Sequence, residues 1–185
     1  MNKIKSICVF CASSKLVDNS YKKVAKELGR EIGKKGLNLV YGGASIGLMG
    51  CVARSVHEEK GKVVGVLPRF FRSKEDIEYH DADELVVTND MRERKAEMDK
   101  RSDAFIVLPG GVGTLEEAME ILSMRQLKLT DKPLVFINSK GFFDNFKKTL
   151  DVMIDQKFAK ENLRNLFAMT RDPKAALEYI FNYKT

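Results

Sequence analysis

The stretch Leu108-Pro109-Gly110-Gly111-Val112-Gly113-Thr114-Leu115-Glu116-Glu117 decides the fold of this chain. The short apolar run before it, Ala104 to Leu108, is typical of a buried parallel strand. After it, apolar residues recur at helical spacing: Leu115, Ala118, Met119 and Leu122. A strand, a glycine-rich turn and a helix start place free backbone N–H groups and a positive dipole end where an anion can bind. The sequence therefore predicts a phosphate-binding turn.

Strand-like and helical segments alternate along the rest of the chain. The further expected strands are Ser6 to Phe10, Leu37 to Tyr41, Val63 to Leu67, Glu84 to Thr88 and Pro133 to Ile137. This alternation predicts an α/β fold, a doubly wound parallel sheet with helices on both faces, in a single domain spanning residues 1–185. In such sheets, ligands bind outside the carboxyl ends of the strands, where the strand order reverses.

Capping residues mark the ends of several expected helices. The start signals are Asp18, Asn19 or Ser20 for the first helix, Asp90 for one over Met91 to Ser102, and Asp172-Pro173 for the last. Gly36 closes the first helix. The segment Arg69 to Asp83 is polar and weakly patterned, so we expect a loop able to close over a site.

The composition is that of an ordinary globular domain. The 185 residues are 44% hydrophobic and 31% charged, with a net charge of +6 that suits a phosphorylated ligand. No apolar run approaches the ~20 residues that span a membrane, and the N-terminus leads directly into a strand. We expect a cytoplasmic protein that binds neither membranes nor nucleic acid, because no nucleic-acid-binding motif is present.

The three cysteines do not suggest a disulfide framework or a metal site. Cys8 and Cys11 form a CxxC within an expected strand, where residues three apart point to opposite faces. Cys51 stands alone, as do both histidines. We expect structural cysteines and no metal.

A second glycine-rich turn, Gly42 to Gly50, follows the expected strand Leu37 to Tyr41 and opens a helix that runs to about Lys60. Both glycine turns follow strands, so we expect one site built from the two loops. Neither turn has the GxGxxG pattern of a dinucleotide fold or the GK[ST] ending of a P-loop. A mononucleotide or a sugar phosphate remains as the ligand.

Thr114 and Glu117 allow two interpretations. T-x-x-E at a helix start is a capping box, in which both side chains bond to free backbone N–H groups. Alternatively, Glu117 is catalytic. Ile121 and Met124 add apolar residues on the side of Glu117, so the helix is apolar over a broad arc, which favours partial enclosure of Glu117 and a subunit interface.

Arg94 is placed between two methionines on one helix face. Met91, Arg94 and Met98 are spaced at i, i+3 and i+7, so Arg94 is expected to point inward. A charged surface helix explains most of the neighbouring charges but not an inward arginine, which needs an anionic partner when buried.

These motifs together resemble the LOG family. Its PGGxGTxxE motif is matched by Pro109 to Glu117, and its M-x-x-R-K motif by Met91, Arg94 and Lys95. Further matches lie at Ile7 to Ser14, Leu39 to Gly43, Gly47 to Gly50 and Val63 to Pro68. The resemblance extends from the first strand to about Leu129.

The resemblance implies a Rossmann-like homodimer that hydrolyses nucleoside 5′-monophosphates to a free base and ribose 5-phosphate, without a cofactor. The implied substrates are cytokinin riboside monophosphates and AMP. Arg94 and Glu117 match the catalytic arginine and glutamate. The implied substrate-binding residues are Ser13, Gly43, Glu75, Lys95, Gly110, Gly111, Val112, Gly113, Thr114, Leu115, Glu116 and Ser123.

Departures from the family pattern leave the choice of base open. They are Val112 in place of tyrosine, Arg92 in place of histidine, and Ala44-Ser45-Ile46 in place of Gly-Asn-Val. A non-catalytic carrier of a nucleotide or phosphorylated cofactor is the alternative, by analogy of fold alone. A pyridoxal-phosphate decarboxylase has little support, because no lysine has a recognisable Schiff-base context.

Overall fold

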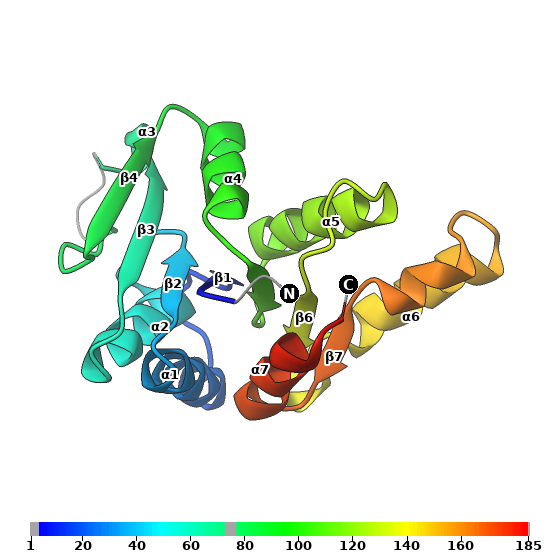
Figure 1. The fold of residues 1–185 in the computed structure, drawn as a ribbon, viewed down its shortest axis with the longest axis horizontal. Coiled ribbons are helices and arrows are strands. Elements are labelled where there is room, and N and C mark those ends of the chain that lie inside the picture. The colour runs from blue at the N-terminus through cyan, green and yellow to red at the C-terminus, as the bar shows by residue number, and fades with distance from the viewer. Residues whose placement is uncertain (1–3, 73–76, 185) are drawn as a thin grey trace.

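The computed structural model describes residues 4–72 and 77–184, which form an α/β fold around one parallel sheet (Figure 1). Its seven strands lie in the order β4-β3-β2-β1-β5-β6-β7. Their bounds are β1 Ser6–Phe10, β2 Asn38–Tyr41, β3 Val63–Pro68, β4 Glu84–Thr88, β5 Ala104–Val107, β6 Leu134–Ile137 and β7 Ala168–Thr170. Every neighbouring pair is parallel, which confirms the predicted doubly wound, Rossmann-like class.

The strand order reverses at the centre of the sheet. β1 pairs with β2 on one side and with β5 on the other, so the chain winds outward in both directions from β1. The crossover from β4 at one edge to β5 passes back over β3, β2 and β1. The carboxyl ends of β1 and β5 therefore flank the position where this fold binds ligands.

The main helices cover both faces of the sheet. Their bounds are α1 Asn19–Lys34, α2 Gly47–Glu58, α4 Met91–Lys100, α5 Val112–Gln126, α6 Asp144–Asp155 and α7 Pro173–Asn182. Helices α1, α2 and α7 pack on one face, and α4, α5 and α6 on the other. Figure 1 shows this division, with α1 and α7 along the lower side of the view and α4 and α5 along the upper side.

Three predicted helix starts are confirmed. The side chains of Asp18, Asp90 and Asp172 accept hydrogen bonds from backbone N–H groups in the first turns of α1, α4 and α7. Each such cap contributes about 1 kcal/mol. Gly36 lies directly after the C-cap of α1 with a φ of 65°, as its predicted closing role requires.

Two parts of the fold were not predicted. β7 has only three half-buried residues and lies at the sheet edge, so it has no hydrophobic pattern long enough to recognise. The segment predicted as a loop after β3 contains a short helix, α3 Arg69–Arg72. Farther along, Ile77 accepts a hydrogen bond from the N–H of Ser45 (2.6 Å), and the N–H of Tyr79 donates to Gly43 (3.0 Å). These bonds attach the segment to the end of β2.

Cys8 lies in β1 and Cys11 directly after it, and the two face opposite sides of the sheet as predicted. Cys8 is buried in the core on the α4–α6 face and Cys11 in the core on the α1–α2 face. Both, like Cys51, are free and buried. Burial raises the pKa of the Cys8 and Cys11 thiols well above the usual range, so both are protonated at neutral pH.

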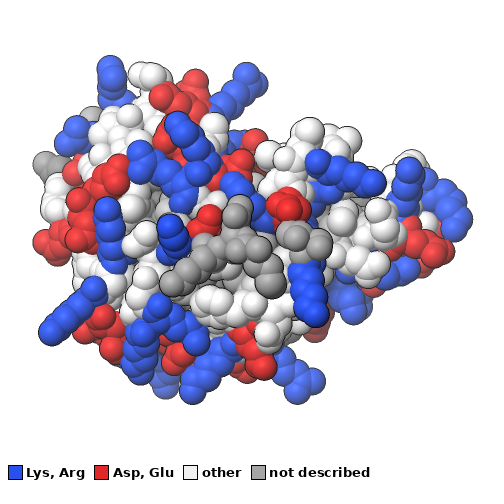
Figure 2. Space-filling view, in the orientation of Figure 1, with Lys and Arg blue, Asp and Glu red and all other residues white. Residues whose placement is uncertain are grey.

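Charge of both signs is spread over the surface. Figure 2 shows Lys and Arg side chains distributed over the whole visible face, with Asp and Glu between them rather than one basic patch. Within residues 4–72 and 77–184, no helix has the length and apolarity needed to cross a membrane.

The start of α2 is occupied by another part of the chain. The backbone N–H groups of Leu48 and Met49 both donate to the carbonyl of Ala12, at 2.9 and 3.4 Å. Gly47 makes this approach possible, because a Cβ there would lie 2.5 Å from the carbonyl carbon of Ser13. The second glycine turn thus joins two loops of the protein, and its helix start is taken up by a backbone carbonyl.

Replacing Gly47 is expected to loosen this junction. Gly47→Ala should lose about 1–2 kcal/mol of unfolding free energy because φ is 60° there, and a further ~1–3 kcal/mol because the methyl group meets backbone atoms. Gly36→Ala is the matched control, since its φ is 65° and no atom lies within 4 Å. Urea unfolding of both variants measures the difference, and equal losses would contradict the account of the junction.

Candidate active site

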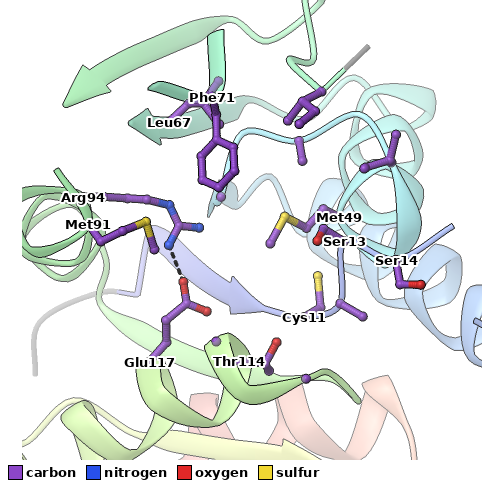
Figure 3. Close-up of a pocket in the computed structure, with 17 residues that line it drawn as sticks. Cys11, Ser13, Ser14, Met49, Leu67, Phe71, Met91, Arg94, Thr114 and Glu117 are labelled. Atoms are coloured by element: carbon purple, nitrogen blue, oxygen red, sulfur yellow. Dashed lines mark hydrogen bonds and ion pairs between the residues drawn. The ribbon is translucent and has the colours of Figure 1, made fainter. Parts of the chain in front are cut away.

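A cavity of about 350 Å³ opens at the carboxyl edge of the sheet, at the predicted reversal of strand order (Figure 3). Its walls come from the ends of β1, β2 and β3 and from the first turns of α2, α4 and α5. The predicted site residues that line it are Ser13, Arg94, Gly111, Gly113, Thr114 and Glu117. Segments far apart in the sequence therefore meet at one site.

Arg94 is buried and fully oriented by its contacts. Only 4% of its surface is exposed, its Nε donates to the carbonyl of Val66 (3.1 Å), and its Nη1 donates to Oε1 of Glu117. The guanidinium lies so close to β2 that a Cβ at Gly42 would be 2.3 Å from Nη2. A buried arginine was predicted to need an anionic partner, and that partner is Glu117.

Glu117 is not a capping residue. Helix α5 begins at Val112 with Gly111 as its N-cap, and no side-chain hydrogen bond caps it, so the capping-box alternative is wrong. Glu117 lies one turn farther along, is 5% exposed, and points toward Arg94 across the cavity wall (Figure 3). Burial raises the pKa of its carboxyl group, and the charge of Arg94 opposes this shift only in part.

The first turn of α5 has room for a ligand. The leading N–H groups of a helix have no partner within the helix, and here no side chain caps them. A Cβ built at Gly111 or Gly113 would meet no atom within 4 Å, although both residues line the cavity. Packing within the protein therefore does not require glycine at these positions, whereas close approach of a ligand to the backbone does.

Gly110, unlike Gly111 and Gly113, must be glycine because of a contact within the protein. A Cβ at Gly110 would lie 2.1 Å from Oγ1 of Thr114, so glycine there allows the threonine side chain to pack back onto the turn. Thr114 is 5% exposed and lines the cavity next to the free backbone groups. Gly110 thus makes room for the Thr114 side chain, and Thr114 forms part of the cavity surface at the first turn of α5.

Lys95 lies outside the cavity lining and joins two helices. Its Nζ pairs with Glu116 and with Glu120 (2.5 Å), and only 15% of its side chain is exposed. Arg94 and Lys95 on α4 thus bind Glu117 and Glu116 on α5, which fixes the two helices against each other. Within this chain, Lys95 and Glu116 position the cavity wall rather than line it.

The remaining predicted site residues are not part of the cavity lining. Val112 is 86% exposed, Ser123 is exposed and Leu115 is half-buried on α5. Gly43 lies behind the lining, where a Cβ would be 3.1 Å from that of Leu67, and its neighbour Gly42 lines the cavity instead. Glu75 lies outside the described residues.

Several lining residues were missed by the sequence reasoning. They are Cys11, Ala12, Ser14, Gly42, Ala44, Ile46, Met49, Leu67, Phe71, Ile77 and Met91. Most of these follow a strand directly, which is a signal that could have found them. Phe71 and Ile77 lie in the segment after β3 that was expected to close over a site, but its weak pattern did not single them out.

The described residues hold no metal-binding group. Within residues 4–72 and 77–184, no three His, Cys, Asp or Glu side chains are placed so that they could bind one ion. Among the described residues that line the cavity, the charged ones are Arg94 and Glu117. The chemistry that this arrangement offers is a buried carboxylate beside a fixed guanidinium and an anion cradle.

Comparison with known proteins shows which family and which relatives the chain is similar to. A family model described as "Possible lysine decarboxylase" matches residues 49–180. The chain is 41% identical to the cytokinin riboside 5′-monophosphate phosphoribohydrolase LOG5 of Arabidopsis thaliana, over 99% of this chain and 80% of that protein. It is also 41% identical to the phosphoribohydrolase LOG of Oryza sativa subsp. japonica, over 89% of this chain and 68% of that protein.

A solved structure shares the fold. The molybdenum cofactor binding protein of Rippkaea orientalis superimposes with a TM-score of 0.73 over 98% of each chain, at 20% sequence identity. At this identity the likeness concerns the fold alone.

Removing Arg94 is expected to make stability depend strongly on pH. In Arg94→Met the Glu117 carboxylate is left buried without its partner, so its pKa in the folded state rises further while that of the unfolded chain stays the same. Stability is then retained below the ordinary glutamate range and falls as pH rises through the raised pKa. We expect a loss of about 3–5 kcal/mol at pH 8 and a smaller loss at pH 5.

Urea unfolding at the two pH values measures this effect. The double variant Arg94→Met/Glu117→Gln should lose the added pH dependence, because the amide has no proton to take up. An equal loss at both pH values in Arg94→Met would show that Glu117 is not the titrating group.

Proposed function

The chain belongs to the LOG family, and on that premise we propose that it hydrolyses the N-glycosidic bond of nucleoside 5′-monophosphates. Water adds to C1′ of the ribose, and the C1′–N bond breaks with its electron pair going to the base. The base takes up the proton that the water loses, so the products are a free base and ribose 5-phosphate. The substrates are AMP and cytokinin riboside 5′-monophosphates. The observation that carries the proposal is the buried Arg94–Glu117 pair beside an unblocked helix start.

The first turn of α5 holds the 5′-phosphate in this proposal. Gly111 and Gly113 line the cavity and have no side chain that would keep a phosphate from the backbone, and the helix dipole favours the dianion. Binding the phosphate, which does not react, fixes the sugar over the cavity wall. This use of remote binding energy raises the rate of the step at C1′.

Glu117 acts on the ribose. Cleavage of a glycosidic bond passes through a state with positive charge at C1′, which carboxylates stabilise in other glycosidases. As a carboxylate, Glu117 opposes that charge and takes a proton from the attacking water. Its raised pKa supports this role, because a general base works best when its pKa approaches the working pH.

Arg94 keeps Glu117 ionised and oriented. It binds the carbonyl of Val66 and Oε1 of Glu117 at once, so the guanidinium is fixed and holds one oxygen of the carboxylate. Arg94 also lines the cavity, where its positive charge can assist the departing base as that base accumulates electrons.

A homodimer is part of the same proposal. Helix α5 carries Leu115, Met119 and Met124 as half-buried apolar side chains at the margin of the core, and Leu127 directly after it is 68% exposed. An apolar strip of this kind on a single chain suits contact with a second copy. Ser123 lies on the same helix and would belong to that region.

Incubation with AMP and with cytokinin riboside 5′-monophosphates tests the activity. Free base and ribose 5-phosphate are measured by chromatography, and Glu117→Gln should lower kcat about 10²–10⁴-fold while AMP still binds. Glu58→Gln serves as the control, because Glu58 pairs with Arg30 at the surface. A wild-type protein that binds AMP without releasing base would favour a carrier, and undiminished turnover in Glu117→Gln would remove Glu117 from the chemistry.

The phosphate cradle has its own test in Gly113→Ala. Alanine is the better helix former, so the free energy of unfolding should stay equal or rise by up to ~1 kcal/mol. The methyl group occupies the space where the phosphate approaches, so kcat/KM should fall about 10- to 100-fold, as for loss of a hydrogen bond to a charged group.

Gly36→Ala is expected to show the opposite pattern. It lies at the amino edge of the sheet, so stability should fall while activity per folded molecule is unchanged. Full activity in Gly113→Ala would mean that the phosphate binds elsewhere.

A further inference from the structure

One wall of the cavity is apolar and has no part in the proposed chemistry. It is formed by Ala44, Ile46, Met49, Leu67, Phe71 and Ile77. These residues come from the ends of β2 and β3, the start of α2, and the segment after β3. None of these side chains carries a charge or an amide group.

Of the three parts of a nucleoside monophosphate, only the base is left to contact this wall. With the phosphate at the first turn of α5 and C1′ beside Glu117, the phosphate cradle and the charged pair are both occupied. The base must then lie against the apolar wall. Such a wall recognises the flat face of a base rather than the hydrogen-bonding groups at its edge.

Phe71 is the aromatic side chain of this wall. Figure 3 shows its ring extending from α3 into the cavity, on the side opposite Glu117 and with the Arg94 guanidinium between them. Its neighbour Phe70 is 49% exposed and does not line the cavity, although the two ring centroids are 4.4 Å apart. The short helix α3 thus presents one phenylalanine inward and keeps the other outside.

We propose that Phe71 is a stacking platform for a purine base and sets the substrate class of the site. This inference rests on the proposed function. Stacking depends on the area of the π-face, so purine monophosphates should bind more tightly than pyrimidine monophosphates. Stacking also tolerates different edge groups, so AMP and IMP should differ less from each other than either differs from CMP.

The absence of tryptophan from the sequence permits a direct test. Phe71→Trp introduces a single tryptophan at the platform, and Phe70→Trp introduces one just outside it. Both are made in Glu117→Gln protein, so that the nucleotide is not consumed. AMP and IMP should quench the fluorescence of the Phe71→Trp protein in a saturable way, whereas ribose 5-phosphate, which has no base, should not.

A second variant measures the contribution of the ring in otherwise wild-type protein. Phe71→Leu keeps an apolar side chain but removes the π-face, so KM for AMP should rise about 5- to 150-fold while inhibition by ribose 5-phosphate is unchanged. Phe70→Leu should change neither value. An unchanged KM in Phe71→Leu, or equal quenching at positions 70 and 71, overturns the platform.

The outcomes separate this inference from the proposed function. If AMP quenches only the Phe71→Trp protein but wild-type protein releases no base, the platform stands and the hydrolase proposal fails. If wild-type protein releases base but the Phe71→Trp protein does not respond to AMP, the hydrolase proposal stands and the platform fails. If calorimetry detects no binding of AMP to the Glu117→Gln protein, both the platform and the hydrolase proposal fail.

Discussion

The buried pair of Arg94 and Glu117 is the constraint on which the rest of the site depends. A charge removed from water needs a partner, and each of these residues is the partner of the other. Their meeting requires the crossover from β4 to β5 to carry α4 back over the sheet, so that Arg94 reaches the carbonyl of Val66 on β3. It also requires Gly42, whose missing side chain leaves room for the guanidinium.

Much of this arrangement could be predicted from the sequence, because the signals are local. Six of the seven strands follow from short apolar runs, and Asp18, Asp90 and Asp172 mark helix starts by their own chemistry. The spacing of Met91, Arg94 and Met98 correctly placed an arginine inside. The partial enclosure of Glu117 was correct for the same reason, since both depend only on helical periodicity.

Other features depend on distant contacts and could not be read from neighbouring residues. T-x-x-E is compatible with a capping box, and only the actual start of α5 at Val112 excludes it. The two glycine turns look alike in sequence, yet the carbonyl of Ala12 binds the N–H groups at the start of α2, whereas no side chain caps the start of α5. Phe71 enters the cavity from a polar segment whose pattern shows neither the helix α3 nor its direction.

The same contrast between the two turns bears on how this fold can change over evolution. The start of α2 is closed by a backbone carbonyl, and no substitution of a side chain removes a carbonyl. The start of α5 is bordered by two glycines with open space around them, so single substitutions there can narrow, reshape or close the anion site without rebuilding the core. Proteins that evolve from this fold can therefore gain or lose ligands at the start of α5 by single mutations, while the start of α2 continues to bind the loop after β1.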